Sequence, residues 1–351
     1  MDRLSLLKQH LKNTLLVEDY PQSKLITLNR PQKLNALNSE MMQGITLACQ
    51  EATSKNIIFR GSNGHLSAGG DVISLVTYPF TVTEFYRSIN YCFNELQKHK
   101  GKVISIAEGY TLGGGAALCM ASNLRVFTPS TKFAMPENSI GFVPDVGAGH
   151  FFSHLPCEAV GLYLMLTGVT IDGNDCYWAG IAHYYVKEVG TLVEELKTAK
   201  DPQAVTEKHH EFPPREASFI VKNWPEIEAV FSNVNCVEEV LQRLAVANTP
   251  FKEKTFREVC KLCPLSLKVC FRAFKRAKSI TYKECLEQDY NLAVQMCLRR
   301  SLNYSRAVHQ KFIKKDKQDP QWQPSSITEI TEQMLDVLFS NPEGPFLKLN
   351  S

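Results

Sequence analysis

The sequence predicts an α/β protein whose first half is mixed and whose second half is helical. Short β-rich runs alternate with helical patterns up to residue 186, which is typical of βαβ units with right-handed crossovers. Residues 196–218 are polar and contain prolines, which indicates a linker. Beyond them the apolar spacing is helical. We therefore expect a core over residues 1–195, a linker over 196–218 and a helical region over 219–351.

The elements follow from turn residues, caps and apolar periodicity. A β-hairpin is expected over residues 13–29, because two β-rich runs flank a turn-forming Asp-Tyr-Pro-Gln segment. Asn38 or Ser39 is a suitable cap for a helix over 41–51. Further strands are expected over 56–60, 103–107 and 182–186, and further helices from 72 and over 84–98, 116–122, 161–166, 172–179, 219–233, 236–246, 252–262, 265–277, 283–300 and 327–340.

Composition is that of an ordinary globular protein. The 351 residues are 44% hydrophobic and 21% charged, enough for about two structural units. A net charge of +3 gives no electrostatic reason for DNA, RNA or a membrane to be the main ligand. No apolar run has the length of about 18 residues that a transmembrane helix needs. Residues 1–16 are amphipathic and predict a first helix, because they lack the apolar segment of a secretory signal, and Asp2 disfavours a mitochondrial presequence.

The eleven cysteines predict buried free thiols in a reducing compartment. Cys49, Cys92, Cys119 and Cys297 each lie singly inside an apolar pattern. Cys260-Lys-Leu-Cys263 has the spacing of half a zinc site, but no second pair or nearby histidine completes it. We interpret that pair as structural and expect no metal.

Two glycine-rich loops are the most informative feature of the chain. Gly113-Gly114-Gly115 lies between an apolar strand and a helix, and residues 67–71 (SAGGD) lie in a similar place. Neither loop has the third glycine of a dinucleotide site or the lysine of a P-loop. A strand, a glycine turn and a helix start bring unpaired N–H groups to one point. Two such loops on neighbouring strands can each direct one N–H group at a shared oxygen, where negative charge develops.

Two carboxylates follow in apolar, proline-marked surroundings. Glu137 lies in AMPEN and Asp145 lies in VPDVG. An apolar setting favours the use of a carboxyl group as a nucleophile or a base over its role as a solvated surface anion. By itself, Glu137 next to Pro136 is equally compatible with a helix cap. Together with the glycine loops, the pair indicates acid–base or nucleophilic chemistry on a group that carries the oxyanion.

These motifs make the chain similar to the crotonase (enoyl-CoA hydratase/isomerase) superfamily. The resemblance covers about residues 12–190 and implies an α/β fold, a crotonase-like spiral of ββα units with a C-terminal helical region. It also implies an acyl-CoA thioester as the small-molecule ligand. The motifs that carry it are LNRPQKLNALN (28–38), SAGGDV (67–72), GYTLGGGAALCMASNLRV (109–126), FAMPENSIGFVPDVGAGHF (133–151) and LTGVTIDGNDCYWAGIAHYYV (166–186).

The resemblance also implies roles for individual residues. The backbone N–H groups of Gly70 and Gly114 would form the oxyanion hole for the thioester carbonyl. Coenzyme A would be part of the substrate, so no separate cofactor is expected. The residues that would border the CoA moiety or the substrate are Lys33, Leu34, Ala36, Ala68, Gly69 and Asp71.

The carboxylates indicate the subgroup. Hydratases carry a glutamate two residues after the three glycines, where this chain has Ala117. MPE followed by PDVG resembles the 3-hydroxyisobutyryl-CoA hydrolases of valine catabolism, as do SLKVCFRAF (266–274), DYNLAVQMC (289–297) and KQDPQW (317–322). This resemblance implies a mitochondrial location. It implies that Glu137 attacks the thioester or activates a water, and that Asp145 holds the 3-hydroxyl group or assists proton transfer.

The chain also departs from that subgroup, and the departures motivate an alternative. The family usually has Arg-Glu-Glu-Tyr where residues 87–91 read Arg-Ser-Ile-Asn-Tyr, without a carboxylate. The tail segment that usually reads Glu-Gly-Val-Arg-Ala is Asn-Tyr-Ser-Arg-Ala at 303–307, and lysines follow at 311–317. The alternative is a hydrolase-like structural subunit of the mitochondrial ribosome, the one case in which nucleic acid is expected as a partner. A homo-oligomer is left open, and no membrane partner is expected.

Overall fold

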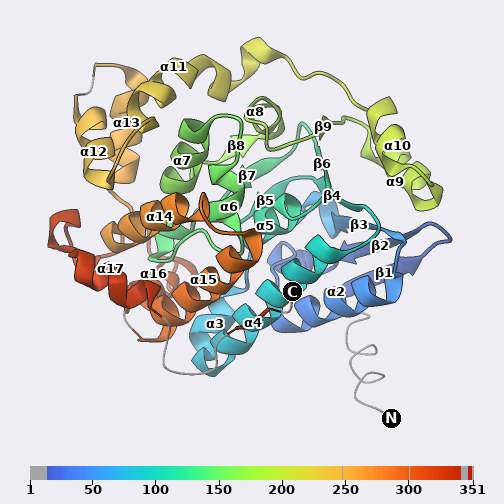
Figure 1. The fold of residues 1–351 in the computed structure, drawn as a ribbon, viewed down its shortest axis with the longest axis horizontal. Coiled ribbons are helices and arrows are strands. Elements are labelled where there is room, and N and C mark those ends of the chain that lie inside the picture. Colours follow the sequence, from blue (N-terminus) through green and yellow to red (C-terminus); the bar gives the residue numbers. More distant parts are fainter. Residues whose placement is uncertain (1–13, 247, 300, 341–346, 350–351) are drawn as a thin grey trace. The chain divides into compact units, whose positions relative to one another are not determined.

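The computed structural model describes residues 14–246, 248–299, 301–340 and 347–349 (Figure 1). The first helix expected near the N-terminus lies outside these ranges. Contacts divide the chain into two compact units, each made from three separate segments. We call residues 1–70, 88–134 and 170–221 the first unit, and residues 71–87, 135–169 and 222–351 the second unit.

The first unit is built on a six-stranded sheet with the order β1-β2-β3-β4-β6-β9. β1 and β2 form the expected antiparallel hairpin, and every other neighbouring pair in this sheet is parallel. Parallel neighbours need crossover connections, which the intervening helices supply. The α/β class predicted from the sequence is therefore confirmed. The strands are β1 Leu15–Asp19, β2 Ser23–Leu28, β3 Asn56–Gly61, β4 Val103–Ala107, β6 Leu124–Phe127 and β9 Tyr184–Tyr185.

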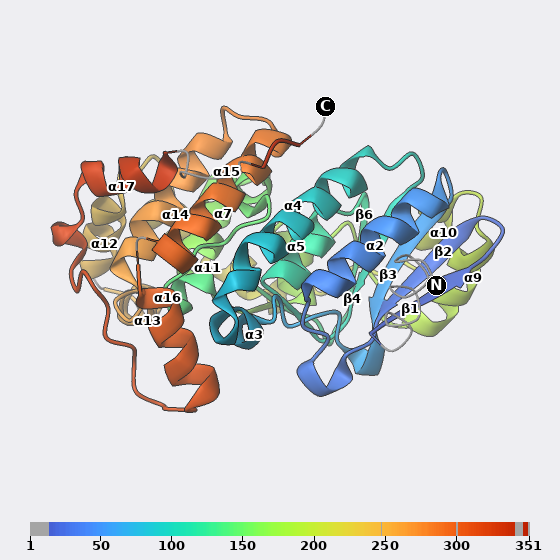
Figure 2. The same ribbon diagram turned by 90° about the horizontal axis from the view of Figure 1, so that it is seen from below.

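Strand β2 shows how both faces of the sheet are covered. Successive side chains of a strand point to opposite faces. Lys24 points to the face of helix α2 (Ser39–Ala52), where its Nζ lies 3.2 Å from Glu51. Ser23 points to the other face, where its hydroxyl donates to the Lys197 carbonyl of helix α9 (Val189–Thr198) at 2.8 Å. Figure 2 shows α2 against these strands, and the double coverage explains why β2 is buried almost throughout.

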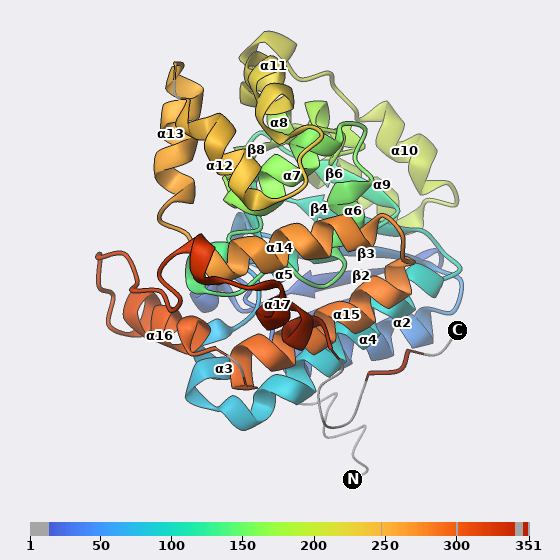
Figure 3. The same ribbon diagram turned by 60° about the vertical axis from the view of Figure 1, so that its left-hand side comes forward.

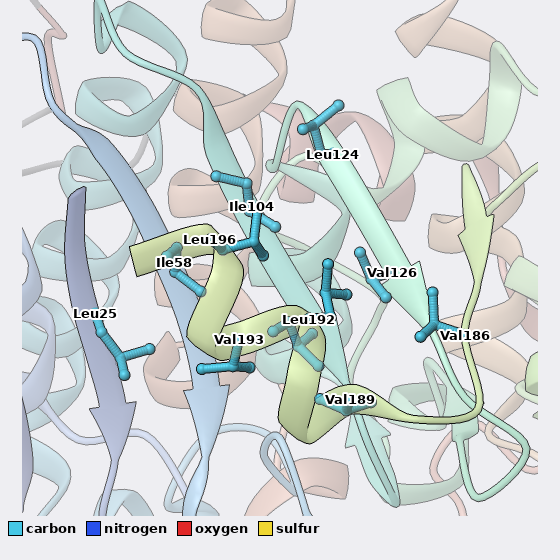
Figure 4. Packing of buried hydrophobic residues seen from close by; sticks show 11 residues of the cluster. Leu25, Ile58, Ile104, Leu124, Val126, Val186, Val189, Leu192, Val193 and Leu196 are labelled. Carbon is cyan, nitrogen blue, oxygen red and sulfur yellow. The ribbon is translucent and has the colours of Figure 1, made fainter. Parts of the chain in front are cut away.

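Helix α9 was not predicted from the sequence, although it covers one face of the six-stranded sheet. Its apolar residues pack on side chains from β2, β3, β4 and β6 (Figure 4). The helix begins after β9 and has an apolar side with Leu192 and Leu196 fully buried. The full cluster is Leu25, Ile58, Ile104, Ile106, Leu124, Val126, Val186, Val189, Leu192, Val193 and Leu196.

A second, three-stranded sheet positions the glycine loops. β5 (Tyr110–Leu112) pairs in parallel with β7 (Lys132–Ala134), and β7 pairs antiparallel with β8 (Ile171–Asp172). Isolated bridges join Ser67 to Thr111 and Leu37 to Gly70. Helix α5 (Gly114–Met120) begins directly after β5, as the sequence predicts for the helix after the three glycines. The remaining helices of the first unit are α8 Gly173–Trp178 and α10 Pro202–Lys208.

The second unit is largely helical, as expected for the C-terminal region. Helix α14 (Pro264–Ala277) packs on α6 (Ala148–Ser153) and α7 (Glu158–Thr167), as Figure 3 shows. Helix α15 (Tyr282–Val294) begins at a capping box of Thr281 and Glu284, then continues as a π-helical turn rather than as the α-helix expected to residue 300. The other helices are α3 Val72–Thr77, α4 Val82–Lys98, α11 Phe219–Phe231, α12 Val237–Ala245, α13 Pro250–Val259, α16 Asn303–Val308 and α17 Glu332–Phe339. Residues 88–98 of α4 belong to the first unit.

The two units differ from the sequential division expected from the sequence. Residues 71–87 and 135–169 cluster with the helical C-terminal residues and not with the predicted core. Residues 196–218, expected to be a linker, include α10 and belong to the first unit. Glu211 N donates to the Tyr185 carbonyl at 2.9 Å, and Asn174 Nδ2 donates to the Pro214 carbonyl at 2.9 Å. These bonds fix the polar segment to strand β9 and helix α8, so its polarity marks an exposed surface and not a free connection.

The eleven cysteines are free thiols. Cys49, Cys92 and Cys119 are buried as expected, whereas Cys297 is half-buried. Cys263 is buried at the start of α14, and Cys260 is exposed. None of the described helices combines the length and the apolar character that crossing a bilayer requires.

Candidate active site

The two glycine loops lie side by side in the first unit. Leu112 N donates to the Ser67 carbonyl at 2.9 Å, which ties the first loop to β5. A Cβ atom built on Gly69 would lie 3.5 Å from Gly114 N, and one built on Gly114 would lie 3.6 Å from Gly70 N. The two amides that the sequence singles out are therefore adjacent.

Both amides are available to a ligand. Neither the Gly70 N–H group nor the Gly114 N–H group has a hydrogen-bond acceptor among the residues that the structure describes. Gly114 is the first residue of α5, so its N–H group has no partner within the helix. Gly113 reaches this position with a φ of +49°, which glycine tolerates. Two adjacent donors of this kind can hold one oxygen as it becomes negative.

Ser67 fixes the position of the first loop. Its hydroxyl donates to the Asn35 carbonyl at 2.9 Å and accepts from Gly69 N at 3.1 Å. Gly69 itself has a φ of +98°, and a Cβ there would lie 3.1 Å from the Leu112 carbonyl oxygen. The close approach of two backbones therefore requires glycine at 69.

Asn35 anchors the same region, and the sequence analysis did not identify it. Asn35 is fully buried in the left-handed region. Its Oδ1 accepts from Arg30 N at 2.9 Å, and its Nδ2 donates to the carbonyls of Ser62 and His65 at 2.9 and 2.7 Å. In the sequence, Asn35 lies inside the motif at 28–38, which indicates the family resemblance. That position alone does not reveal the hydrogen bonds that its side chain makes.

Replacing Asn35 is expected to destabilise the first unit. Asn35→Ala removes these three hydrogen bonds and a fourth from the Ser62 hydroxyl, and it leaves buried backbone groups without partners, so we expect a loss of about 2–4 kcal/mol in the free energy of unfolding. Urea denaturation followed by circular dichroism measures it. Asn63→Ala is the control, because Asn63 is an exposed asparagine that also has a positive φ. Equal stability of the two variants would contradict the anchoring role.

The residues expected to border the CoA moiety or substrate lie in or around the first loop, and all but one belong to the first unit. Ala68 N donates to the Leu34 carbonyl at 2.9 Å, and Ala36 N donates to the Lys33 carbonyl at 3.0 Å. Lys33 and Leu34 are exposed, and Gly69 is buried beside them. Asp71 is the exception, because it belongs to the second unit and caps α3, where its Oδ1 accepts from Ser74 N at 3.2 Å.

The positions where relatives would carry further glutamates hold no carboxylate here. Ala117 is buried within α5. Ile89 is 1% exposed, and its Cδ1 lies 3.5 Å from the Cβ position of Gly114. Hydrocarbon from Leu37 and Ile89 therefore lies beside Gly114, and a low-dielectric neighbour of this kind strengthens the electrostatic interaction of an N–H group with a bound oxygen.

Glu137 and Asp145 lie together in the second unit. Glu137 begins the short 3₁₀ turn Glu137–Ile140 and is 8% exposed, and no described residue gives its Oε2 a hydrogen-bond partner. Asp145 is 4% exposed, and its Oδ2 likewise has no partner within the described part of the chain. Burial raises the pKa of Glu137 to about 8. Burial, and then repulsion from Glu137 and Asp289, raises the pKa of Asp145 well above its ordinary value. Glu137 is therefore held ready to exchange a proton near neutral pH, and ionisation of Asp145 is disfavoured.

A third acid, Asp289, belongs to this cluster, and the sequence analysis missed it. It is 2% exposed on α15, and its Oδ2 accepts from Gly147 N at 2.8 Å. Burial raises its pKa to about 7. In the sequence, Asp289 is the first residue of the segment DYNLAVQMC (289–297). An acid in a helical pattern is ordinarily assigned to the exposed face, so the sequence does not show that this one is buried.

Aromatic side chains surround the cluster and keep it apolar. The ring of Phe142 lies 5.6 Å from that of Tyr86 and 5.5 Å from that of Tyr304, between ring centroids. The Tyr304 hydroxyl is buried without a hydrogen-bond partner among the described residues. Burial raises the pKa of both tyrosines, so they remain neutral donors at physiological pH.

The turn that carries Glu137 is fixed by its neighbours in the second unit. Asn138 Nδ2 donates to the carbonyls of Met165 and Leu166 at 3.0 and 2.9 Å. Lys311 Nζ donates to the Ser139 carbonyl at 2.6 Å. Lys311 is the first residue of the basic segment 311–317, and it therefore supports this turn instead of forming part of an exposed basic face.

The raised pKa values predict a pH-dependent stability. Glu137, with a pKa of about 8 when folded and 4.5 as its ordinary value, binds a proton in the folded state that the unfolded state lacks. The stability that protonated Glu137 contributes to the folded state is therefore present near pH 5 and is lost as the pH rises through about 8. Glu137→Gln should raise the free energy of unfolding at pH 8.5 by about 1–3 kcal/mol and change it little at pH 5.

Chemical denaturation at both pH values measures this effect. The difference between wild type and variant reports the Glu137 carboxyl together with its repulsion of Asp145, because the other groups titrate in both proteins. Burial, for example, lowers the pKa of His183 to about 4, so His183 acts in the opposite direction below pH 6.5 in each. A variant that is no more stable than wild type at pH 8.5 would contradict the assignment.

In the described ranges, no group of three or more His, Cys, Asp or Glu side chains is arranged to hold a metal ion.

A family model described as enoyl-CoA hydratase/isomerase matches residues 23–339. The chain belongs to the enoyl-CoA hydratase/isomerase family. The glycine loops, the buried carboxyls and the helical tail are thus features of a family member, and the resemblance drawn from the sequence motifs is confirmed.

Relatives within the family carry hydrolase names. The chain is 31% identical to a mitochondrial 3-hydroxyisobutyryl-CoA hydrolase of Xenopus laevis, over 99% of this chain and 96% of that protein. It is 32% identical to the protein of the same name from Homo sapiens, over 95% and 90%. The fold is similar to that of a carnitinyl-CoA dehydratase from Mycobacterium thermoresistibile, with a TM-score of 0.87, 24% identity and coverage of 95% and 98%. The predicted crotonase fold is therefore confirmed, and these comparisons give no support to a ribosomal subunit.

Proposed function

We propose that this family member hydrolyses acyl-CoA thioesters, with 3-hydroxyisobutyryl-CoA or a close β-hydroxyacyl-CoA as its substrate. The main support is the pair of adjacent amides at Gly70 and Gly114, which have no acceptor among the described residues. The names of the relatives support the acyl group and a mitochondrial location. Ala117 disfavours hydration, because that reaction needs a second carboxylate at this position.

The amides act on the carbonyl oxygen in this proposal. Attack at the thioester carbon moves the carbonyl electron pair onto the oxygen. The N–H groups of Gly70 and Gly114 hold that oxyanion in the tetrahedral intermediate. Collapse of the intermediate breaks the carbon–sulfur bond and releases the CoA thiolate, which takes a proton. Residues around the first loop, namely Lys33, Leu34, Ala36, Ala68 and Gly69, border the CoA moiety.

Glu137 supplies the attack in one of two ways. As a nucleophile, its carboxylate oxygen bonds to the acyl carbon and forms an anhydride, which water then hydrolyses. As a base, it removes a proton from a water that attacks directly. Asp145, whose ionisation is disfavoured by burial, donates in its protonated form to the 3-hydroxyl oxygen or supplies the proton that the thiolate takes. Acid quenching during turnover separates the routes, because an acyl adduct on the Glu137 peptide forms only in the first.

A thioester panel tests the function. Purified protein is incubated with 3-hydroxyisobutyryl-, 3-hydroxypropionyl-, isobutyryl- and crotonyl-CoA, and CoA release is followed with a thiol reagent. We expect release from the hydroxyacyl substrates at least ~10-fold faster than from isobutyryl-CoA, since Asp145 would bind the hydroxyl group. Hydration of crotonyl-CoA should be absent. No release above background from any thioester would refute the proposal.

A further inference from the structure

The turn that follows Asp145 has an unfavourable backbone. Val146 has a φ of +56° and Gly147 a φ of +85°, and Ala148 N donates to the Asp145 carbonyl at 3.1 Å. A β-branched residue in the left-handed region is a steric outlier. Such a conformation persists only where neighbouring residues hold it, and it occurs most often at functional sites.

Helix α15 holds this turn at two points. Asp289 Oδ2 accepts from Gly147 N at 2.8 Å. Two turns earlier, the ring of Tyr282 occupies the space that a side chain at 147 would need, because a Cβ there would lie 2.3 Å from it. Residues seven apart share one face of an α-helix. One face of α15 therefore closes over the turn.

Asp289 also acts on Asp145 through charge. Repulsion from Asp289 is one cause of the raised pKa of Asp145. The Cys285 thiol, one turn away on α15, lies 3.8 Å from the same Asp289 oxygen. The titratable groups facing Asp145 are Glu137 from the 3₁₀ turn, Tyr86 from α4, Cys297 from the π-helical turn, Tyr304 from α16 and Asp289 from α15.

We propose that Asp289 is a positioning residue for Asp145. It holds the turn of residues 145–148 by accepting the Gly147 N–H group, and when ionised it repels a negative charge on the Asp145 carboxyl. Asp145 is thereby kept oriented, and its ionisation is disfavoured. The consequence for catalysis rests on the proposed function, whereas the structural and electrostatic effects do not.

Two variants separate the hydrogen bond from the charge. Asp289→Asn keeps an acceptor oxygen for Gly147 N and removes the charge. Asp289→Leu removes both at similar volume. Glu253→Gln is the matched control, because it removes one negative charge from an exposed position on α13 of the same unit.

The first measurement needs no substrate. Carbon-13 NMR of the aspartate carboxyls, with Asp145→Asn for assignment, follows the titration of Asp145. We expect its midpoint to fall by at least about half a pH unit in Asp289→Asn and to stay unchanged in Glu253→Gln. Hydrogen exchange of the Gly147 amide should be at least ~10-fold faster in Asp289→Leu and within ~3-fold of wild type in Asp289→Asn. An unshifted midpoint in Asp289→Asn, or unchanged exchange in Asp289→Leu, would overturn the proposal.

The second measurement uses thioester hydrolysis. In Asp289→Leu we expect kcat to fall ~10–100-fold with KM within ~3-fold of wild type. The reason is that the variant loses the orientation of the Asp145 carboxyl and keeps the groups that bind the substrate. Asp289→Asn should keep kcat within ~3-fold, with the pH dependence of kcat/KM altered relative to Glu253→Gln. If the protein hydrolyses no thioester, the proposed function fails while the NMR result still decides the role of Asp289. If Asp289→Leu does not fold, Asp289→Asn alone decides it.

Discussion

Glu137→Gln is expected to lower kcat for thioester hydrolysis by at least ~10³-fold, with KM changed only a few-fold. Glutamine keeps the size of the side chain but can act neither as a nucleophile nor as a base. The variant should fold, because it replaces a buried acid whose ionisation is already disfavoured. Initial rates at pH 8 with saturating 3-hydroxyisobutyryl-CoA measure the loss.

The pH profile supplies an independent check on the same residue. Burial raises the pKa of Glu137 to about 8, so the reactive carboxylate forms only as the pH rises toward that value. We expect kcat/KM of the wild type to increase with pH up to about 8. The apparent pKa values of this profile belong to the coupled acids together and not to one residue. Glu253→Gln should keep full activity, as an exposed acid of the same unit. Retention of more than about a tenth of the wild-type rate in Glu137→Gln would exclude it as the reacting group.

Gly114→Ala is expected to lower kcat/KM by about 10²–10³-fold without unfolding the protein. The added methyl group would lie 3.6 Å from Gly70 N and would occupy the space where the oxyanion has to sit. The nearest other atom is Leu37 Cδ1 at 3.3 Å, the end of a flexible side chain. Alanine also favours the helix that begins here. Steady-state kinetics together with thermal denaturation separate lost activity from lost stability.

Gly190→Ala is the control for that variant. Apart from its chain neighbours and the backbone of its own helix, no atom of the described residues lies within 4 Å of the Cβ position of Gly190, which is exposed on α9 of the same unit. Its activity should equal that of the wild type. If the amides and Glu137 serve one chemical step, the double variant Gly114→Ala with Glu137→Gln should lose little more than Glu137→Gln alone. Wild-type activity in Gly114→Ala would contradict the role of the two amides.

Most of the candidate site could be inferred from the sequence because its parts are local. Gly70 and Gly114 each follow a short apolar strand within one motif, and Glu137 and Asp145 lie eight residues apart in another. The chemistry of glycine and of a buried carboxyl can be recognised in such short windows. The structure places the two glycines together and the two acids together, as the motifs predict.

Other residues could not be found in this way because their roles depend on distant partners. Asn35 binds a loop 27 to 30 residues away, and Asp289 binds an amide 142 residues away. Helix α9 was missed because residues 189–198 follow the last expected strand and lead into a polar segment. The role of its apolar face becomes clear only in the fold, where that face packs on side chains from four strands.

The α/β class, the two glycine loops and the acids that follow them could be read directly from the residues. These features depend on residue type and spacing over a few turns or strands, which local backbone preferences translate directly. Three further properties depend on the folded chain: the grouping of segments into two compact units, the lack of an acceptor for the two amides among the described residues, and the third acid beside Asp145. Those properties arise from long-range packing, which removes water from some groups and supplies partners to others, and no local pattern encodes that choice.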